Sequence, residues 1–100
     1  MQTITPTELA ALGEDARIID VREVDELRSV RLARAVNIPM STFIDRIDEV
    51  PRDETVYILC AAGARSAQVT QYLEQRGYDA VNVSGGIGEW AATGNPVERG

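Results

Sequence analysis

The chain has 100 residues, a formal net charge of −6 and a hydrophobic content of 44%, which are typical of one globular domain, here expected over residues 1–100. No apolar run approaches the roughly 18 residues that cross a bilayer, so we expect no membrane partner. The negative charge repels nucleic-acid phosphates and no basic, aromatic-interleaved stretch offsets it, so we expect no nucleic-acid partner.

The first predicted elements are a short helix and a buried strand. Thr5 and Glu8 have the spacing of a capping box, and Pro6 occupies the first helical position. The helix that begins here is expected to end at Gly13. Residues 17–21 follow as a brief β-branched, apolar run without strict alternation, which is typical of a strand covered on both faces.

Strand and helix patterns then alternate along the rest of the chain. The predicted strands are residues 35–38, 55–59 and 80–83, and the predicted helices are residues 41–49, 64–76 and 87–93. Short strands that alternate with helices predict an α/β fold, with a mostly parallel central sheet flanked by helices on both faces. Ligands of such sheets bind at the carboxyl ends of the strands, where the chain's single cysteine lies.

That cysteine, Cys60, stands between the apolar run at residues 55–59 and the helix predicted to follow. A thiol in this position faces backbone N–H groups and the positive end of the helix dipole, which both favour the thiolate. Gly63 can adopt angles that turn N–H groups toward the sulfur, and Arg65 can place a permanent charge near it. We therefore predict a nucleophile of lowered pKa; a sulfur sealed among apolar side chains, with the amides turned away, would contradict this.

The other residue types limit the available chemistry. All ten basic residues are arginine, and the chain has neither lysine nor histidine, which excludes Schiff-base lysines and histidine general bases. One cysteine cannot form an internal disulfide or, without histidine, complete the usual zinc site, so we predict no metal and no cofactor. The first residues lack the features of a secretory signal, and a cytoplasmic location is expected.

Four separated segments resemble the motifs of single-domain rhodanese-like sulfurtransferases. In chain order they are DVRE at residues 20–23, AVNIP at 35–39, CAAGARS at 60–66, and GGIGEW at 85–90 followed by GNPV at 94–97. The resemblance implies a rhodanese-like fold and an enzyme that moves sulfane sulfur through a persulfide on Cys60. The implied partners are a small donor such as thiosulfate or a persulfide, a thiol or cyanide acceptor, and alternatively a protein donor or acceptor.

The same resemblance implies roles for the residues that match its motifs. Cys60 is the catalytic residue, and the loop after it binds substrate through Ala61, Ala62, Gly63, Ala64 and Arg65. We expect support of this loop from Asp20, Arg22 and Ser66. For the first two a plainer interpretation is open, in which Asp20 caps a turn and Arg22 pairs on the surface with a neighbouring carboxylate.

Residues 30–35 depart from the G-H-I-P-G-A segment of many family members. The arginines there and just before it, Arg28, Arg31 and Arg34, recur every three residues and form either a solvated face or a rim that binds an anionic donor. Ala61 and Ala62 stand where some thiosulfate-using members carry a basic side chain.

Two other functions remain open at this point. A cysteine phosphatase or arsenate reductase shares the implied fold, but those relatives place five residues between cysteine and arginine, whereas this chain has four. A catalytically weak interaction module is the other alternative, and the presence of both Cys60 and Arg65 counts against it.

Overall fold

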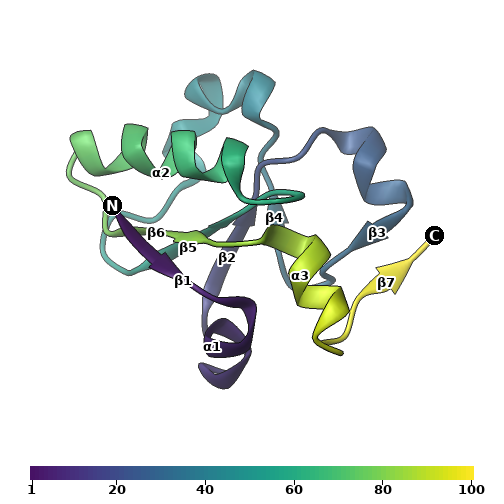
Figure 1. Ribbon diagram of the computed structural model, residues 1–100. Coiled ribbons are helices and arrows are strands. Elements are labelled where there is room, and N and C mark those ends of the chain that lie inside the picture. The colour runs from purple at the N-terminus through teal and green to yellow at the C-terminus, as the bar shows by residue number, and fades with distance from the viewer.

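The computed structural model describes residues 1–100 and places five strands in one sheet. These strands are β1 (Gln2–Ile4), β2 (Arg17–Asp20), β4 (Val36–Asn37), β5 (Val56–Leu59) and β6 (Ala80–Val83). Their order is β1-β6-β5-β2-β4, and every pairing is parallel (Figure 1). The predicted parallel sheet is therefore confirmed, with β5 at its centre. Two further strands, β3 (Val30–Arg31) and β7 (Glu98–Arg99), form a separate antiparallel pair.

Helices cover both faces of this sheet. The α-helices are α1 (Pro6–Ala11), α2 (Ala64–Gln75) and α3 (Gly86–Ala92), and the 3-10 helices are η1 (Val24–Arg28), η2 (Met40–Thr42) and η3 (Ile44–Glu49). Figure 1 shows α2 above the sheet and α1 below it. The predicted α/β architecture is confirmed. None of these helices is long and apolar enough to span a membrane.

The core has two parts because successive side chains of a buried strand point to opposite faces. On the α2 face, Ile19 of β2 and Ile58 of β5 pack with Cys60 and residues of α2. On the other face, Ile18 and Leu59 pack with residues of α1 and α3. Cys60 therefore continues the side of β5 that faces α2.

The predicted first helix is confirmed with its cap. The Thr5 hydroxyl accepts a hydrogen bond from the Glu8 amide at 3.1 Å, and the Glu8 carboxylate accepts one from the Thr5 amide at 2.9 Å. Pro6 is the first helical residue. Such a cap contributes about 1 kcal/mol to helix stability.

The helix predicted over residues 41–49 is wrong in type. The chain forms the two 3-10 helices η2 and η3 there, and Arg46 has non-helical angles of φ −110° and ψ 16°. Serine, threonine, aspartate and isoleucine dominate this segment, and these residues have only middling helix propensity. With few favourable residues, the segment forms short 3-10 turns instead of a continuous α-helix.

The sequence also missed three short strands. β1 is an edge strand of three residues, of which Gln2 and Thr3 are exposed. β3 and β7 have two residues each, and both residues of β7 are exposed. Strands this short and polar show no apolar periodicity, so only their pairing in the folded chain defines them.

Candidate active site

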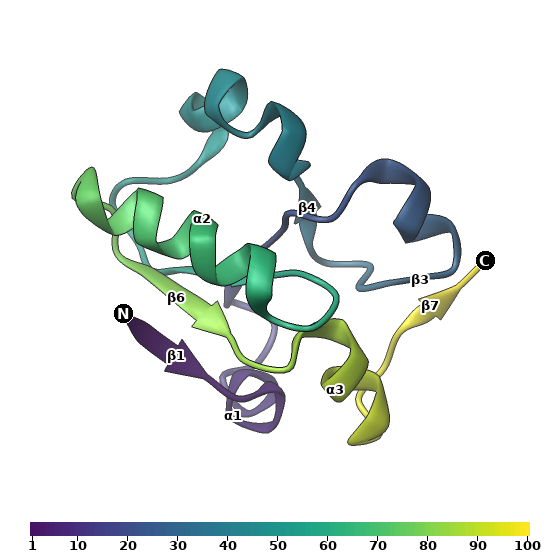
Figure 2. The ribbon, with the colours of Figure 1, turned by 45° about the horizontal axis from the view of Figure 1, so that its top comes forward.

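The candidate site lies at the carboxyl end of the central strand. Cys60 directly follows β5, whose neighbours are β6 and β2, and the chain then turns through Ala61 and Ala62 into α2. Figure 2 shows this loop next to the start of α3. Cys60 is only 1% exposed. The sequence did not predict so deep a burial.

The amides of the loop nevertheless face the sulfur. The Gly63 amide donates to Cys60 Sγ at 3.0 Å, and Ser66 Oγ lies 3.2 Å from the same atom. Burial raises the pKa of the Cys60 thiol, but hydrogen bonding of the sulfur with the Ser66 side chain and with the Ser66, Gly63 and Ala62 amides lowers it, leaving the pKa below its ordinary value. A sulfur that is sealed among apolar side chains, with the amides turned away, would contradict a nucleophile. The sulfur is buried here, but the Gly63 amide faces it.

Two glycines give the loop its shape. Gly63 has φ +106°, which a residue with a side chain rarely adopts, and this conformation directs its amide to the sulfur. Gly86 has φ +58°, and a Cβ on it would lie 2.4 Å from the carbonyl oxygen of Cys60. The first turn of α3 donates to the loop, from Ile87 N to Cys60 O at 2.9 Å and from Gly88 N to Ala61 O at 3.1 Å. The start of α3 therefore holds the loop carbonyls.

Arg65 binds a carboxylate that no sequence motif indicated. Its guanidinium donates to both oxygens of Glu26 in η1, at 2.7 and 2.8 Å. The pair lowers the pKa of Glu26 to about 2 and raises that of Arg65. The negative charges that Cys60 and Asp20 can carry raise the pKa of Arg65 further, although its side-chain hydrogen bonds go to Glu26.

Asp20 and Arg22 form a buried ion pair that is linked to Glu26 by a hydrogen bond. Arg22 donates to both carboxylate oxygens of Asp20, with a shortest distance of 2.9 Å, and each side chain is at most 3% exposed. The alternative in which Arg22 pairs on the surface with a neighbouring carboxylate is therefore wrong. Arg22 also donates to the carbonyl oxygens of Val30 at 2.8 Å and Glu26 at 3.5 Å. The pair thus holds the segment that carries the partner of Arg65.

Asn82 is a second site residue that sequence reasoning missed. It lies on β6, is 5% exposed, and accepts a hydrogen bond from Ser66 Oγ at 2.5 Å. Its amide nitrogen donates to Gly63 O at 3.4 Å. One signal was present in the sequence, because asparagine is unusual inside an apolar strand and must find partners there.

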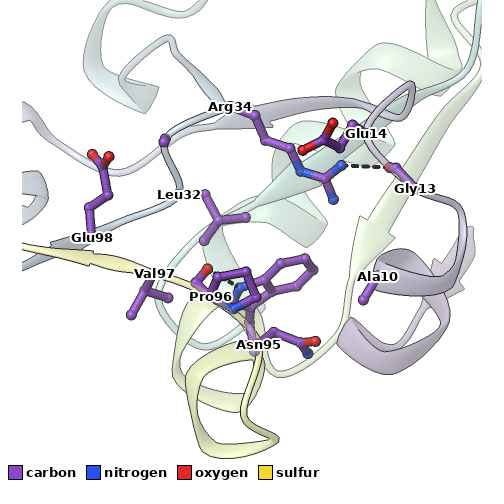
Figure 3. Close-up of a pocket in the computed structure, with 11 residues that line it drawn as sticks. Ala10, Gly13, Glu14, Leu32, Arg34, Asn95, Pro96, Val97 and Glu98 are labelled. Carbon is purple, nitrogen blue, oxygen red and sulfur yellow. Dashed lines mark hydrogen bonds between the residues drawn. The ribbon is translucent and has the colours of Figure 1, made fainter.

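Arg28, Arg31 and Arg34 do not share one environment in the structure. Arg31 pairs with Glu98 at 3.1 Å, and Arg28 is exposed. Arg34 lines a pocket of about 520 Å³. Figure 3 shows its side chain extending toward Gly13. Arg34 donates to the Gly13 carbonyl and lies 5.7 Å from the centre of the Trp90 ring. Cys60 does not line this pocket, and a donor-binding role for Arg34 stays a prediction.

Known proteins resemble this chain along most of its length. The family model of the rhodanese-like domain matches residues 5–93. The chain belongs to the rhodanese-like family. This rhodanese-like domain is also 40% identical, over 85 residues, to a sulfurtransferase of Allochromatium vinosum, and the alignment covers 84% of this chain and 79% of that protein.

Two other relatives extend the comparison along the chain. The rhodanese-like domain is 30% identical to the thiosulfate sulfurtransferase GlpE of Glaesserella parasuis, over 97% of this chain and 93% of that protein. The crystal structure of a rhodanese-related protein from Thermoplasma volcanium superimposes with a TM-score of 0.93 and 34% identity, covering 98% of each chain. The rhodanese-like fold implied by the motifs is therefore confirmed.

Proposed function

We propose that this rhodanese-like domain is a sulfurtransferase that carries sulfane sulfur as a persulfide on Cys60. The observation that supports the proposal most strongly is the hydrogen bond from the Gly63 amide to Cys60 Sγ at 3.0 Å. Donors directed at a buried sulfur favour its anionic form, which is the nucleophile. The sulfurtransferases among its relatives support the same class of reaction.

The proposed reaction has two displacements. In the first, the Cys60 thiolate attacks the outer sulfur of thiosulfate or of a persulfide. A new sulfur–sulfur bond forms, the donor's sulfur–sulfur bond breaks, and its electron pair leaves on sulfite or on the donor thiolate. In the second, a thiolate or cyanide attacks the outer sulfur of the Cys60 persulfide and restores the Cys60 thiolate. Neither step needs a general base once the thiol is ionised, which is consistent with a chain that has no histidine.

The loop after Cys60 supplies the surroundings of the transferred sulfur. Ala61 and Ala62 have small side chains, so the outer sulfur of a persulfide meets little steric opposition there. Arg65 brings a positive charge to an otherwise acidic protein, and Glu26 fixes its position. Because Cys60 is 1% exposed, the donor's outer sulfur has to react with a nearly buried atom.

The four-residue spacing between Cys60 and Arg65 also bears on the choice of substrate. It makes a smaller cradle than the five-residue spacing of the phosphatases and arsenate reductases, which suits a single sulfur better than a tetrahedral oxyanion. The donor and acceptor in this proposal are small molecules, a sulfur-bearing protein, or both. A cytoplasmic setting is part of the proposal, since reducing conditions keep the single thiol free.

Turnover tests the proposal directly. Thiosulfate and cyanide are supplied to the wild type and to Cys60→Ser, and sulfite and thiocyanate are measured. The proposal expects both products from the wild type and none above background from Cys60→Ser. If the wild type instead hydrolyses an aryl phosphate through Cys60 and forms no thiocyanate, the protein is a phosphatase and the proposal fails.

A further inference from the structure

The hydroxyl of Ser66 lies between the reactive sulfur and a buried amide. Its oxygen is 3.2 Å from Cys60 Sγ and 2.5 Å from Asn82 Oδ1. All three residues are at most 5% exposed. The buried side-chain nitrogen and oxygen atoms all have hydrogen-bond partners within the protein, and here the three side chains contact one another.

The orientation of the Asn82 amide follows from its other neighbour. Gly63 O is a carbonyl oxygen and can only accept, and it already accepts from the Ala67 amide at 3.2 Å. The Asn82 side chain must therefore turn its NH₂ group to Gly63 O, at 3.4 Å, and its oxygen to Ser66. A flipped amide would place two acceptors face to face.

The Ser66 hydroxyl has one proton to donate in a hydrogen bond, and the two possible acceptors are Cys60 Sγ and Asn82 Oδ1. Oxygen atoms 2.5 Å apart need a proton between them, and Asn82 Oδ1 has none, so the Ser66 hydroxyl donates to Asn82. A hydroxyl that donates to Asn82 can only accept from Cys60. In the thiol form, the S–H group of Cys60 therefore donates to Ser66 Oγ.

Loss of the thiol proton reverses this arrangement. A thiolate has no proton to donate, and a lone pair of Ser66 would then face a negative sulfur. The hydroxyl can instead rotate its proton to the sulfur, but Asn82 Oδ1 is then left without a donor in a buried place. An acceptor left without its partner carries a desolvation penalty, so Asn82 opposes the rotation.

We propose that Asn82 is a positioning residue that holds the Ser66 proton while Cys60 is a thiol and releases it to the sulfur when the thiolate forms. The thiol proton itself leaves to solvent before the thiolate attacks a donor. The part of this inference that concerns attack rests on the proposed function, whereas the competition between Asn82 and the sulfur for one proton does not.

The charged side chains near Cys60 take no part in the hydrogen bond between Ser66 and Asn82. Arg65 of α2 pairs with Glu26 of η1, and Arg22 pairs with Asp20 at the end of β2. The first turn of α3 contributes Glu89. None of these side chains forms a hydrogen bond with Ser66 Oγ or with the Asn82 amide, so a change at Asn82 alters the hydroxyl without breaking an ion pair.

The test is the pH dependence of thiolate formation in the full chain. Thiolate is followed by ultraviolet absorbance, with Cys60→Ser as the blank, and by the rate of alkylation with iodoacetamide. Asn82→Leu keeps the shape of the side chain but removes the acceptor oxygen, so the hydroxyl is free for the sulfur. The pH at which half of Cys60 is thiolate, the midpoint, is expected to fall by about one unit. This shift corresponds to the difference in strength between a neutral and a charge-assisted hydrogen bond.

Two further variants identify the cause of that shift. Placing Asn82→Leu in a Ser66→Ala background should abolish the shift, because no hydroxyl remains to be released. Thr70→Val removes a neighbouring buried bond, from Thr70 Oγ1 to Ser66 O at 2.7 Å, without touching the Ser66 hydroxyl, and should leave the midpoint unchanged. An unchanged or higher midpoint in Asn82→Leu, or the same fall in the Ser66→Ala background, would overturn the inference.

Asn82→Asp keeps the inference testable if Asn82→Leu does not fold. Aspartate keeps an acceptor oxygen opposite Ser66 and adds a negative charge near the sulfur, while it loses the NH₂ donor to Gly63, so the midpoint of thiolate formation should rise above that of the wild type. A fall in this variant would assign the effect to the Gly63 contact and refute the inference. Because neither probe is a sulfur donor, a protein that shows these shifts but transfers no sulfur would refute the proposed function alone.

Discussion

Arg65 and Glu26, 39 positions apart, are joined by two hydrogen bonds of 2.7 and 2.8 Å. This contact ties the first turn of α2 to η1. The carbonyl of Glu26 accepts in turn from Arg22, which is paired with Asp20. A continuous polar connection therefore leads from the end of β2 to the loop that holds the reactive sulfur.

Removing the charge of Arg65 should impair the use of an anionic donor. Arg65→Gln removes a permanent positive charge from the site and takes from the Glu26 carboxylate its hydrogen-bonded cation, so both thiosulfate and the Cys60 thiolate are held less favourably. We expect kcat/KM for thiosulfate to fall about tenfold or more and the thiolate midpoint to rise. Arg46→Gln is the matched control, because Arg46 forms an equally short bidentate pair with Glu49 outside the site. Equal losses in both variants would contradict a role specific to Arg65.

The same ion pair should make stability depend on pH in acid. The pKa of Glu26 is lowered from 4.5 to about 2, so its contribution is complete above the unfolded-state value and is lost as the pH falls through the folded-state value. Urea unfolding of the wild type should therefore show a loss of stability between about pH 5 and pH 2. Glu26→Gln, which has no carboxylate to protonate, should lose less over that range. An identical pH dependence in the two proteins would show that the pair does not contribute.

Substitution of Gly86 should disrupt the contact between α3 and the active loop. A Cβ on Gly86 would lie 2.4 Å from Cys60 O, and the residue has φ +58°. Gly94 also has a positive φ, of +85°, but a Cβ added there would have no other atom within 4 Å. In urea unfolding, Gly86→Ala should cost about 3 kcal/mol or more and Gly94→Ala about 1 kcal/mol. Similar costs would mean that the loop moves aside without penalty.

A basic side chain added to the loop should improve the use of thiosulfate. Ala62 is exposed and adjoins Gly63, so Ala62→Arg brings a second positive charge to the donor's path. We expect kcat/KM for thiosulfate to rise severalfold, as a gain of up to about 1 kcal/mol implies, and the gain to shrink at high salt. Ala92→Arg adds the same charge at the end of α3 and should not produce it. A gain of equal size from both variants would indicate a general effect of net charge.

The sequence predicted the elements whose signals are local. The capping box of Thr5 and Glu8 uses neighbours three positions apart, and the strand that ends at Leu59 is a continuous apolar run. Both are present in the structure. The place of Cys60 at the end of that strand follows from the same run.

The missed features depend on contacts between distant segments. The partner of Arg65 lies on η1, which has no regular apolar pattern, and the partner of Ser66 lies on a different strand. The sequence also could not show that Cys60 is nearly sealed, because its burial depends on how α2 packs over β5. Helix propensity alone did not separate a 3-10 turn from an α-helix at residues 41–49.

The most direct test of the central claim is the intact mass of the protein after incubation with thiosulfate, without any acceptor. Wild type and Cys60→Ser are compared under the same conditions, and a thiol is then added to each. We expect the wild type alone to gain one sulfur atom and to lose it again to the thiol. A wild type that gains no sulfur, or a Cys60→Ser variant that gains as much, would show that Cys60 does not carry the sulfur.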